Sequence, residues 1–74
     1  MIAPGARVEI LSDNTTYTQG LLRGMAGIIT DAHQITTQGR GALVLYHVEI
    51  DPDWLPATFG IKGWWYLAEE LKPL

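Results

Sequence analysis

The sequence predicts a small all-β domain, in which short strands form one barrel or sandwich. Glycine and proline recur at short intervals, and the runs between them are apolar and rich in strand-forming residues. Some of these runs alternate apolar with polar side chains, which is the period of a strand with one buried face. The chain of 74 residues shows no repeat and no linker, so residues 1–74 are expected to form a single domain. Because it has no cysteine, neither a disulfide nor a thiolate metal site can brace the fold.

The first strand is predicted at residues 6–11, where apolar and polar side chains alternate. Ala6, Val8 and Ile10 should therefore face the core, and the residues between them should face water. Residues 12–20 follow and are almost entirely polar. Because such side chains compete with the backbone for hydrogen bonds, we expect a long loop there.

The second strand should begin after a pair of glycines, Gly24 and Gly27. Two glycines three residues apart indicate a tight turn and a backbone that approaches its neighbour too closely for a side chain. Residues 34–41 end in Gly-Arg-Gly and are predicted to be a hairpin loop.

The third strand, residues 42–50, has the clearest alternation in the chain. The side chains expected on the core face are Val44, Tyr46, Val48 and Ile50. Leu43 and Leu45 fall on the other face, where an isolated barrel would leave them partly wet. Asp-Pro-Asp at residues 51–53 should end the strand, because proline cannot donate to a sheet ladder. Residues 54–60 are read as a connection.

The fourth strand is predicted at residues 61–67. With Lys62 taken as outward, the alternation places Trp65 and Leu67 inside and Trp64 and Tyr66 outside. A bulge at Gly63 would reverse this assignment. Residues 68–74 are expected to form one short helical turn and a final strand.

These elements together are the layout of a known fold: five short strands, a long polar first loop, a glycine pair before the second strand and a helical turn before the last. The sequence resembles five-stranded SH3-like barrels. Leu21, Gly24, Gly27 and Ile29 are similar to the glycine-and-aliphatic core of the KOW-type element. Residues 64–74 look like the ending of small SH3-like proteins common in bacteria and their phages. The resemblance covers roughly residues 5–74 and implies a closed barrel with a short helical turn before its last strand.

Related barrels imply different functions. KOW domains commonly contact RNA or the transcription machinery, but this sequence lacks the basic residues that usually surround their glycine. The layout is also similar to the small accessory E subunit of photosystem I, again without its basic surface. Type II dihydrofolate reductase builds one active pore from four SH3-like subunits. Its Val-Gln-Ile-Tyr segment has no counterpart here, since the nearest string, residues 44–47, reads Val-Leu-Tyr-His. We therefore do not expect dihydrofolate reductase activity.

Charge and composition disfavour two classes of partner. Five basic residues are scattered among eight acidic ones, for a net charge of −3. Because nucleic-acid binding depends mainly on Lys and Arg that neutralise phosphates, nucleic acid is a disfavoured partner. Adsorption to a membrane is disfavoured for the same reason. No run approaches the roughly 18 apolar residues of a membrane span, and residues 1–5 do not resemble a signal peptide, so a cytoplasmic protein is expected.

Few residues are candidates for a metal site or a catalytic site. Asp31 and His33 could share a strand face, but a zinc site needs three or four ligands, and a solvated strand end is the simpler interpretation. His47 is read as a surface residue. Asp51 and Asp53 flank a proline, as in an ordinary turn. Neither a nucleophile beside a base nor a phosphate-cradling glycine pattern occurs. We therefore expect no catalytic residue, no metal, no cofactor and no enzymatic activity of the isolated chain.

Aromatic residues are the main candidates for a binding surface, because tryptophan and tyrosine typically anchor interfaces. The predicted aromatic rim consists of Tyr17, Trp54, Phe59, Trp64 and Tyr66. The alternative is that one of the adjacent tryptophans is core and the other is shielded by loop aromatics. Leu43 and Leu45 are predicted to support self-association.

Three functions remain open at this stage. The first is a non-catalytic interaction module that binds a protein partner or a second copy of itself, with the resemblance hinting at a phage or mobile-element accessory protein. The second is a KOW-like module that contacts RNA or the transcription and translation machinery. The third is a ligand-binding or enzymatic site that forms only between subunits of an oligomer.

Overall fold

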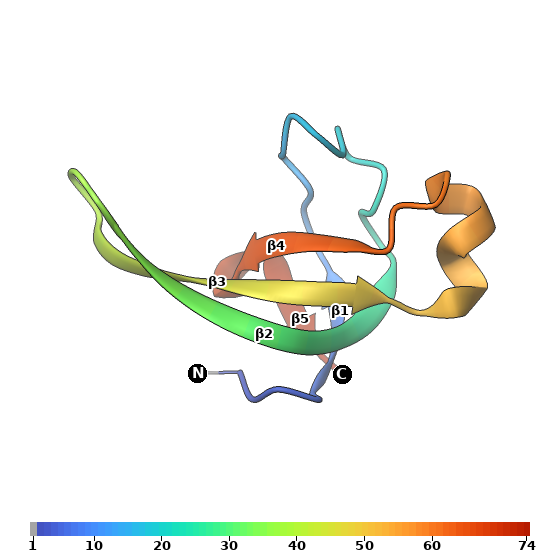
Figure 1. Ribbon diagram of the computed structural model, residues 1–74, viewed down its shortest axis with the longest axis horizontal. Helices are drawn as coiled ribbons and strands as arrows, with labels where there is room; N and C mark the ends of the chain where they lie inside the picture. The colour runs from blue at the N-terminus through green and yellow to red at the C-terminus, as the bar shows by residue number, and fades with distance from the viewer. Residues whose placement is uncertain (1) are drawn as a thin grey trace.

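The computed structural model describes residues 2–74, and within them five strands form one antiparallel sheet (Figure 1). The strands are β1 (Arg7–Ile10), β2 (Ala26–Thr37), β3 (Gly41–Ile50), β4 (Gly63–Leu67) and β5 (Leu71–Pro73). Two 3-10 helices, η1 (Pro52–Thr58) and η2 (Ala68–Glu70), flank β4 within the same residues. Neither is long or apolar enough to cross a membrane. The predicted all-β class is confirmed.

The sheet is strongly bent but open. Its order is β4-β3-β2-β1-β5, so β4 and β5 are the edge strands. Among residues 2–74 no ladder joins these two edges. The predicted closure into a barrel is therefore not found. A last strand of three residues, already paired with β1, offers little backbone to a further neighbour.

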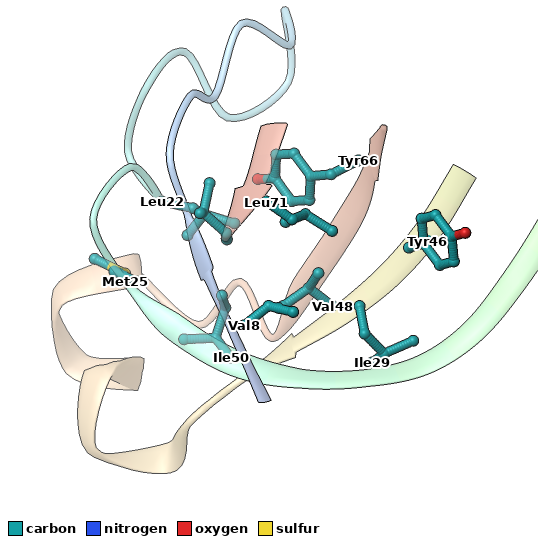
Figure 2. Packing of buried hydrophobic residues seen from close by; sticks show 10 residues of the cluster. Val8, Leu22, Met25, Ile29, Tyr46, Val48, Ile50, Tyr66 and Leu71 are labelled. Atoms are coloured by element: carbon teal, nitrogen blue, oxygen red, sulfur yellow. The ribbon is translucent and has the colours of Figure 1, made fainter. Parts of the chain in front are cut away.

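The core lies on the inner, concave side of this bent sheet, where side chains from every strand converge (Figure 2). Val8 and Ile10 of β1 are completely buried, and Ala6 before them is half-buried, as the alternation predicts. On β3 the predicted core residues Tyr46, Val48 and Ile50 are buried. The remaining buried hydrophobic residues are Leu22, Met25, Ile29, Tyr66 and Leu71.

Gly27 permits the close approach of β2 to β3 that the glycine pair predicts. A Cβ atom at this position would lie 2.9 Å from Val48 Cγ1 and still closer to the carbonyl oxygen of Glu49. Such a contact leaves no room for any side chain. Gly24 has a φ of +84°, which supplies the tight turn before the strand.

The hairpin between β2 and β3 is longer in its strands and shorter in its turn than predicted. Residues 34–37 belong to β2, so the predicted loop at residues 34–41 is reduced to a turn at residues 38–40. Ile35, Thr36 and Thr37 are β-branched and favour a strand. Gly39, with a φ of +89°, lies in the turn.

This hairpin extends beyond the rest of the sheet (Figure 1). Residues 34–37 of β2 and 41–44 of β3 pair with each other. The ladder from β1 stops at Ile28, and the ladder from β4 stops at Leu45. We call this two-stranded extension, residues 34–44, the hairpin arm.

The region after β3 is helical rather than an irregular connection. Pro52 ends β3 and begins η1, which shows why the strand stops where the sequence predicts. The buried Thr58 closes η1, because its hydroxyl donates to the carbonyls of Leu55 at 3.0 Å and Ile61 at 2.8 Å. As a result β4 begins at Gly63, two residues later than predicted.

The helical turn before the last strand is confirmed as η2. Glu70 fixes it, since its Oε1 accepts a hydrogen bond of 2.9 Å from the backbone N–H of Leu67. Leu71 follows directly and is buried, as predicted.

Candidate interaction surface

The two adjacent tryptophans of β4 point to opposite faces, in the reverse of the predicted orientation. Trp64 lies opposite Val48 and packs against the core, whereas Trp65 lies opposite His47 on the outer face. Tyr66, predicted to face outward, has no exposed surface. The prediction failed because it counted the alternation from Lys62, which precedes the strand.

Gly63 explains why the alternation of inward and outward side chains starts at the first residue of β4. A Cβ atom on Gly63 would lie 3.1 Å from His47 Cε1 and closer still to the carbonyl oxygen of Val48. Only glycine fits against β3 at this point. With Gly63 on the outer face, Trp64 must turn inward.

Burial of Tyr66 removes it from the predicted rim and gives it a structural role. Its hydroxyl donates to Oδ1 of the buried Asp13 at 3.1 Å. The other Asp13 oxygen accepts from the backbone N–H of Leu22 at 3.0 Å, and the hydroxyl of Thr18 also donates to Oδ1. Burial, reinforced by the Asp13 carboxylate, raises the pKa of Tyr66 well above its ordinary value of 10.0. Asp13 thus fastens the long polar loop to the core.

Fastening the loop places Tyr17 beside Trp64. The two rings stack with their centroids 4.4 Å apart and their planes 6° from parallel. Tyr17 itself is 60% exposed, so one of its ring faces covers Trp64 while the other meets solvent. These two members of the predicted rim do come together.

Trp54 and Phe59 lie apart from that pair, at the η1 end of the molecule. Trp54 is 40% exposed and Phe59 is 87% exposed. Phe59 has a φ of +53°, in the left-handed region that follows the last turn of η1. No ring of residues 2–74 stacks on either side chain. The predicted rim is therefore not one continuous surface.

A different surface unites β2, β3 and β4 on the side of the sheet away from the core. The register places His33 opposite Leu45, Ile35 opposite Leu43, Leu45 opposite Leu67, and His47 opposite Trp65. We call these seven residues the outer face: His33, Ile35, Leu43, Leu45, His47, Trp65 and Leu67. Its five large hydrophobic side chains are all half-buried. Both predicted self-association residues, Leu43 and Leu45, belong to it.

A groove of about 450 Å³ runs over the middle of the outer face. Its lining consists of His33, Leu45 and Trp65 of the outer face together with Trp64, whose side chain packs against the core on the inner face. The Trp65 ring is its largest side chain. Grooves with apolar and aromatic walls and a few polar groups are the usual form of binding sites.

Two imidazoles hold the Trp65 ring in place. His47 meets it edge-on with the centroids 5.1 Å apart, and His33 does so at 6.0 Å. His47 is in turn fixed by a hydrogen bond of 2.8 Å between its Nδ1 and the hydroxyl of Thr30. The predicted surface position of His47 is confirmed, and its neighbours are an indole and a hydroxyl.

Charges mark the two ends of the outer face. Arg40 stands at the tip of the hairpin arm, where its guanidinium lies 3.3 Å from Glu69 of η2. Asp31 and Glu49 are exposed at the opposite end, beyond the point where the arm joins the rest of the sheet. Within residues 2–74 neither of these two carboxylates forms a salt bridge.

Among the described residues no cluster of metal ligands is found. No three His, Asp or Glu side chains among residues 2–74 gather closely enough to hold a metal ion. Every buried side-chain N or O atom that the structure describes has a hydrogen-bond partner. The buried Asp13 therefore already has its donors and offers no unpaired group to a ligand.

A comparison with known proteins finds no matching family model, no matching curated protein and no matching solved structure.

Proposed function

We propose that this chain is a non-catalytic protein-interaction module that binds its partner through the outer face. The observation that carries the proposal is the groove of about 450 Å³ at Leu45 and Trp65. Large apolar side chains that a small domain keeps on a solvent-facing sheet surface typically mark a protein-binding site.

The apolar character of the surface favours a protein over a nucleic acid. Arg40 at the tip of the hairpin arm is paired with Glu69, and Arg7, which the register places on the same side of the sheet as the outer face, is paired with Asp51. A phosphate backbone would instead meet the carboxylates of Asp31 and Glu49. These charges, together with the net charge of −3, weigh against the KOW-like alternative.

The strand order supports the finer proposal that the fold is a variant of the SH3-like barrel. The last strand pairs beside the first, and a 3-10 turn precedes it, as in the layout that the sequence resembles. Under this proposal the outer face replaces the predicted aromatic rim as the main contact. The exposed face of Tyr17, stacked on Trp64, would extend that contact beyond β4.

A peptide-display selection tests the proposed function. Wild-type protein is used for positive selection, and the variant Leu45→Arg is used for counter-selection. We expect peptides with apolar and aromatic residues whose affinity falls by about tenfold or more for Leu45→Arg and Trp65→Ala, because both changes remove the groove's apolar walls.

Phe59→Ser is the matched control, since it removes an exposed aromatic residue that does not line the groove. It should bind the selected peptides as the wild type does. Circular dichroism verifies that each variant is folded. Selected peptides that bind equally well to Leu45→Arg and Trp65→Ala, or that depend on Phe59, would contradict the proposal. Binding of RNA at low salt by the wild type would favour the KOW-like alternative instead.

A further inference from the structure

We infer that the partner seated on the outer face is a second copy of this chain, packed face to face with its strands running in the opposite direction. This inference rests on the proposed function, because it names the occupant of the same surface. Three features of the structure support it: an arm that needs cover, an apolar centre, and opposite charges at the two ends.

The hairpin arm meets its own chain through Val44, which packs against the core, and through Arg40, which contacts Glu69, but its outer side needs a further cover. Residues 34–37 and 41–44 pair only with each other, and a two-stranded hairpin is marginally stable at best in water. Ile35 and Leu43, on the outer face of the arm, are nevertheless half-buried hydrophobic residues. A second copy laid across the arm would bury both and remove the cost of exposing them.

The centre of the outer face suits a copy of itself. Leu45 lies midway along β3 between Gly41, at the start of the strand, and Glu49. A two-fold axis that passes beside Leu45, in the plane of the sheet and across the strands, would place Leu45 against its counterpart. Leu43 of each copy would then lie near His47 and Trp65 of the other. An interface of this kind uses the same patch on both subunits.

The charges at the ends follow the same symmetry. The two-fold axis that places Leu45 against its counterpart also places the tip of the hairpin arm of one copy over the opposite end of the outer face of the other copy. Arg40, whose contact with Glu69 lies in solvent, would thereby also approach Glu49, which has no salt-bridge partner among the described residues. A parallel arrangement would instead place Glu49 near Glu49, where like charges repel. Charge complementarity thus selects the antiparallel arrangement.

The size of the patch indicates a weak dimer. From residue 41 to residue 49 a strand spans roughly 27 Å, and three strands span roughly 14 Å across. A contact of this extent lies at the low end of specific interfaces, where complexes are transient. Dimer formation should therefore depend strongly on concentration.

Sedimentation velocity over a concentration series is the test. The wild type should shift from monomer to dimer as concentration rises. Leu45→Arg should lower the association constant by about tenfold or more, because it places a charge at the two-fold centre. Phe59→Ser should leave it unchanged. A wild type that stays monomeric at every concentration, or a Leu45→Arg variant that dimerises as the wild type does, overturns the inference.

A charge swap tests the orientation. Arg40→Glu and Glu49→Arg should each weaken the dimer, and the double variant should recover most of the loss. Arg23→Glu, an exposed charge change in the turn before β2, is the control and should have little effect. If the double variant is no better than the weaker single one, the antiparallel arrangement is wrong.

The same data separate this inference from the proposed function. A wild type that is monomeric but binds Leu45-dependent display peptides retains the proposed function and loses only the second copy. If no Leu45-dependent peptide is found and the chain is monomeric, both fail.

Discussion

The two faces of β3 contain similar residues but contribute to the protein in different ways. On the inner face Tyr46, Val48 and Ile50 are buried in one core cluster with side chains from every other strand. On the outer face Leu43 and Leu45 are just as apolar, yet the groove beside Leu45 is open. A chain of this size has enough structure to cover one side of its sheet. What it leaves apolar on the other side is available for binding.

The largest difference should be in stability. Ile50→Ala removes a buried side chain and should lower the free energy of unfolding by about 2–5 kcal/mol. Leu45→Ala, on the same strand but on the open face, should cost less than about 1 kcal/mol in the monomer, because Leu45 is already partly in water. Urea denaturation of the two variants at low protein concentration measures both values. Equal losses would mean that the outer face is part of the core.

Next in size is the hydrogen bond that fastens the polar loop. Tyr66→Phe leaves Asp13 buried with one donor fewer and should cost about 1–3 kcal/mol. The same variant should increase hydrogen exchange at the amide of Leu22, which donates to the other Asp13 oxygen. A variant as stable as the wild type, with unchanged exchange, would show that Asp13 does not depend on Tyr66.

The raised pKa of Tyr66 predicts a pH dependence of similar size. The hydroxyl stays neutral in the folded protein at a pH where it ionises in the unfolded chain. The stabilisation that the neutral Tyr66 hydroxyl gives to the folded protein is therefore complete below about pH 10. As the pH rises further, the free energy of unfolding falls by up to about 1.4 kcal/mol for each pH unit. Denaturation curves between about pH 8 and about pH 11 should show this slope in the wild type and a shallower slope in Tyr66→Phe. Identical slopes would contradict the assigned role.

The smallest effect concerns the stacked pair on the inner side of β4. Tyr17→Ala removes a largely exposed ring from Trp64 and should cost about 0.5–1.5 kcal/mol. The fluorescence of Trp64 should shift to longer wavelength as water reaches its uncovered face. Unchanged fluorescence would mean that the two rings do not stack in solution.

The sequence predicts the positions of the strands better than their lengths or their closure. Alternation at residues 6–11 and 42–50 gives the correct inner faces, because a single buried face imposes a period of two. It does not predict the hairpin arm, since the glycines near residue 40 mark the turn but not how far the strands continue on either side. Closure depends on whether the edges β4 and β5 meet, and no local pattern decides that.

The site is the part that alternation predicted least well. Leu43 and Leu45 are correctly placed on the outer face, because β3 is regular throughout. Trp65 was missed, since the alternation of β4 starts at Gly63 and not at Lys62. The signal was present in Gly63, a glycine at the start of a strand that otherwise holds large side chains. The burial of Asp13 had no such signal, because it depends on Tyr66 from a distant part of the chain.

The central claim is that the outer face is the interaction surface. NMR tests it most directly, by following the amide chemical shifts as the protein is diluted from millimolar to micromolar concentration. If the outer face is the interaction surface, the shifts that change will belong to residues 33–35, 43–47 and 65–67, with Arg40 and Glu49 at the two ends. The amide chemical shifts of η1 and of β1 will not change. Shifts that do not change on dilution or on addition of a selected peptide, or that change around Trp54 and Phe59 instead, would contradict the claim.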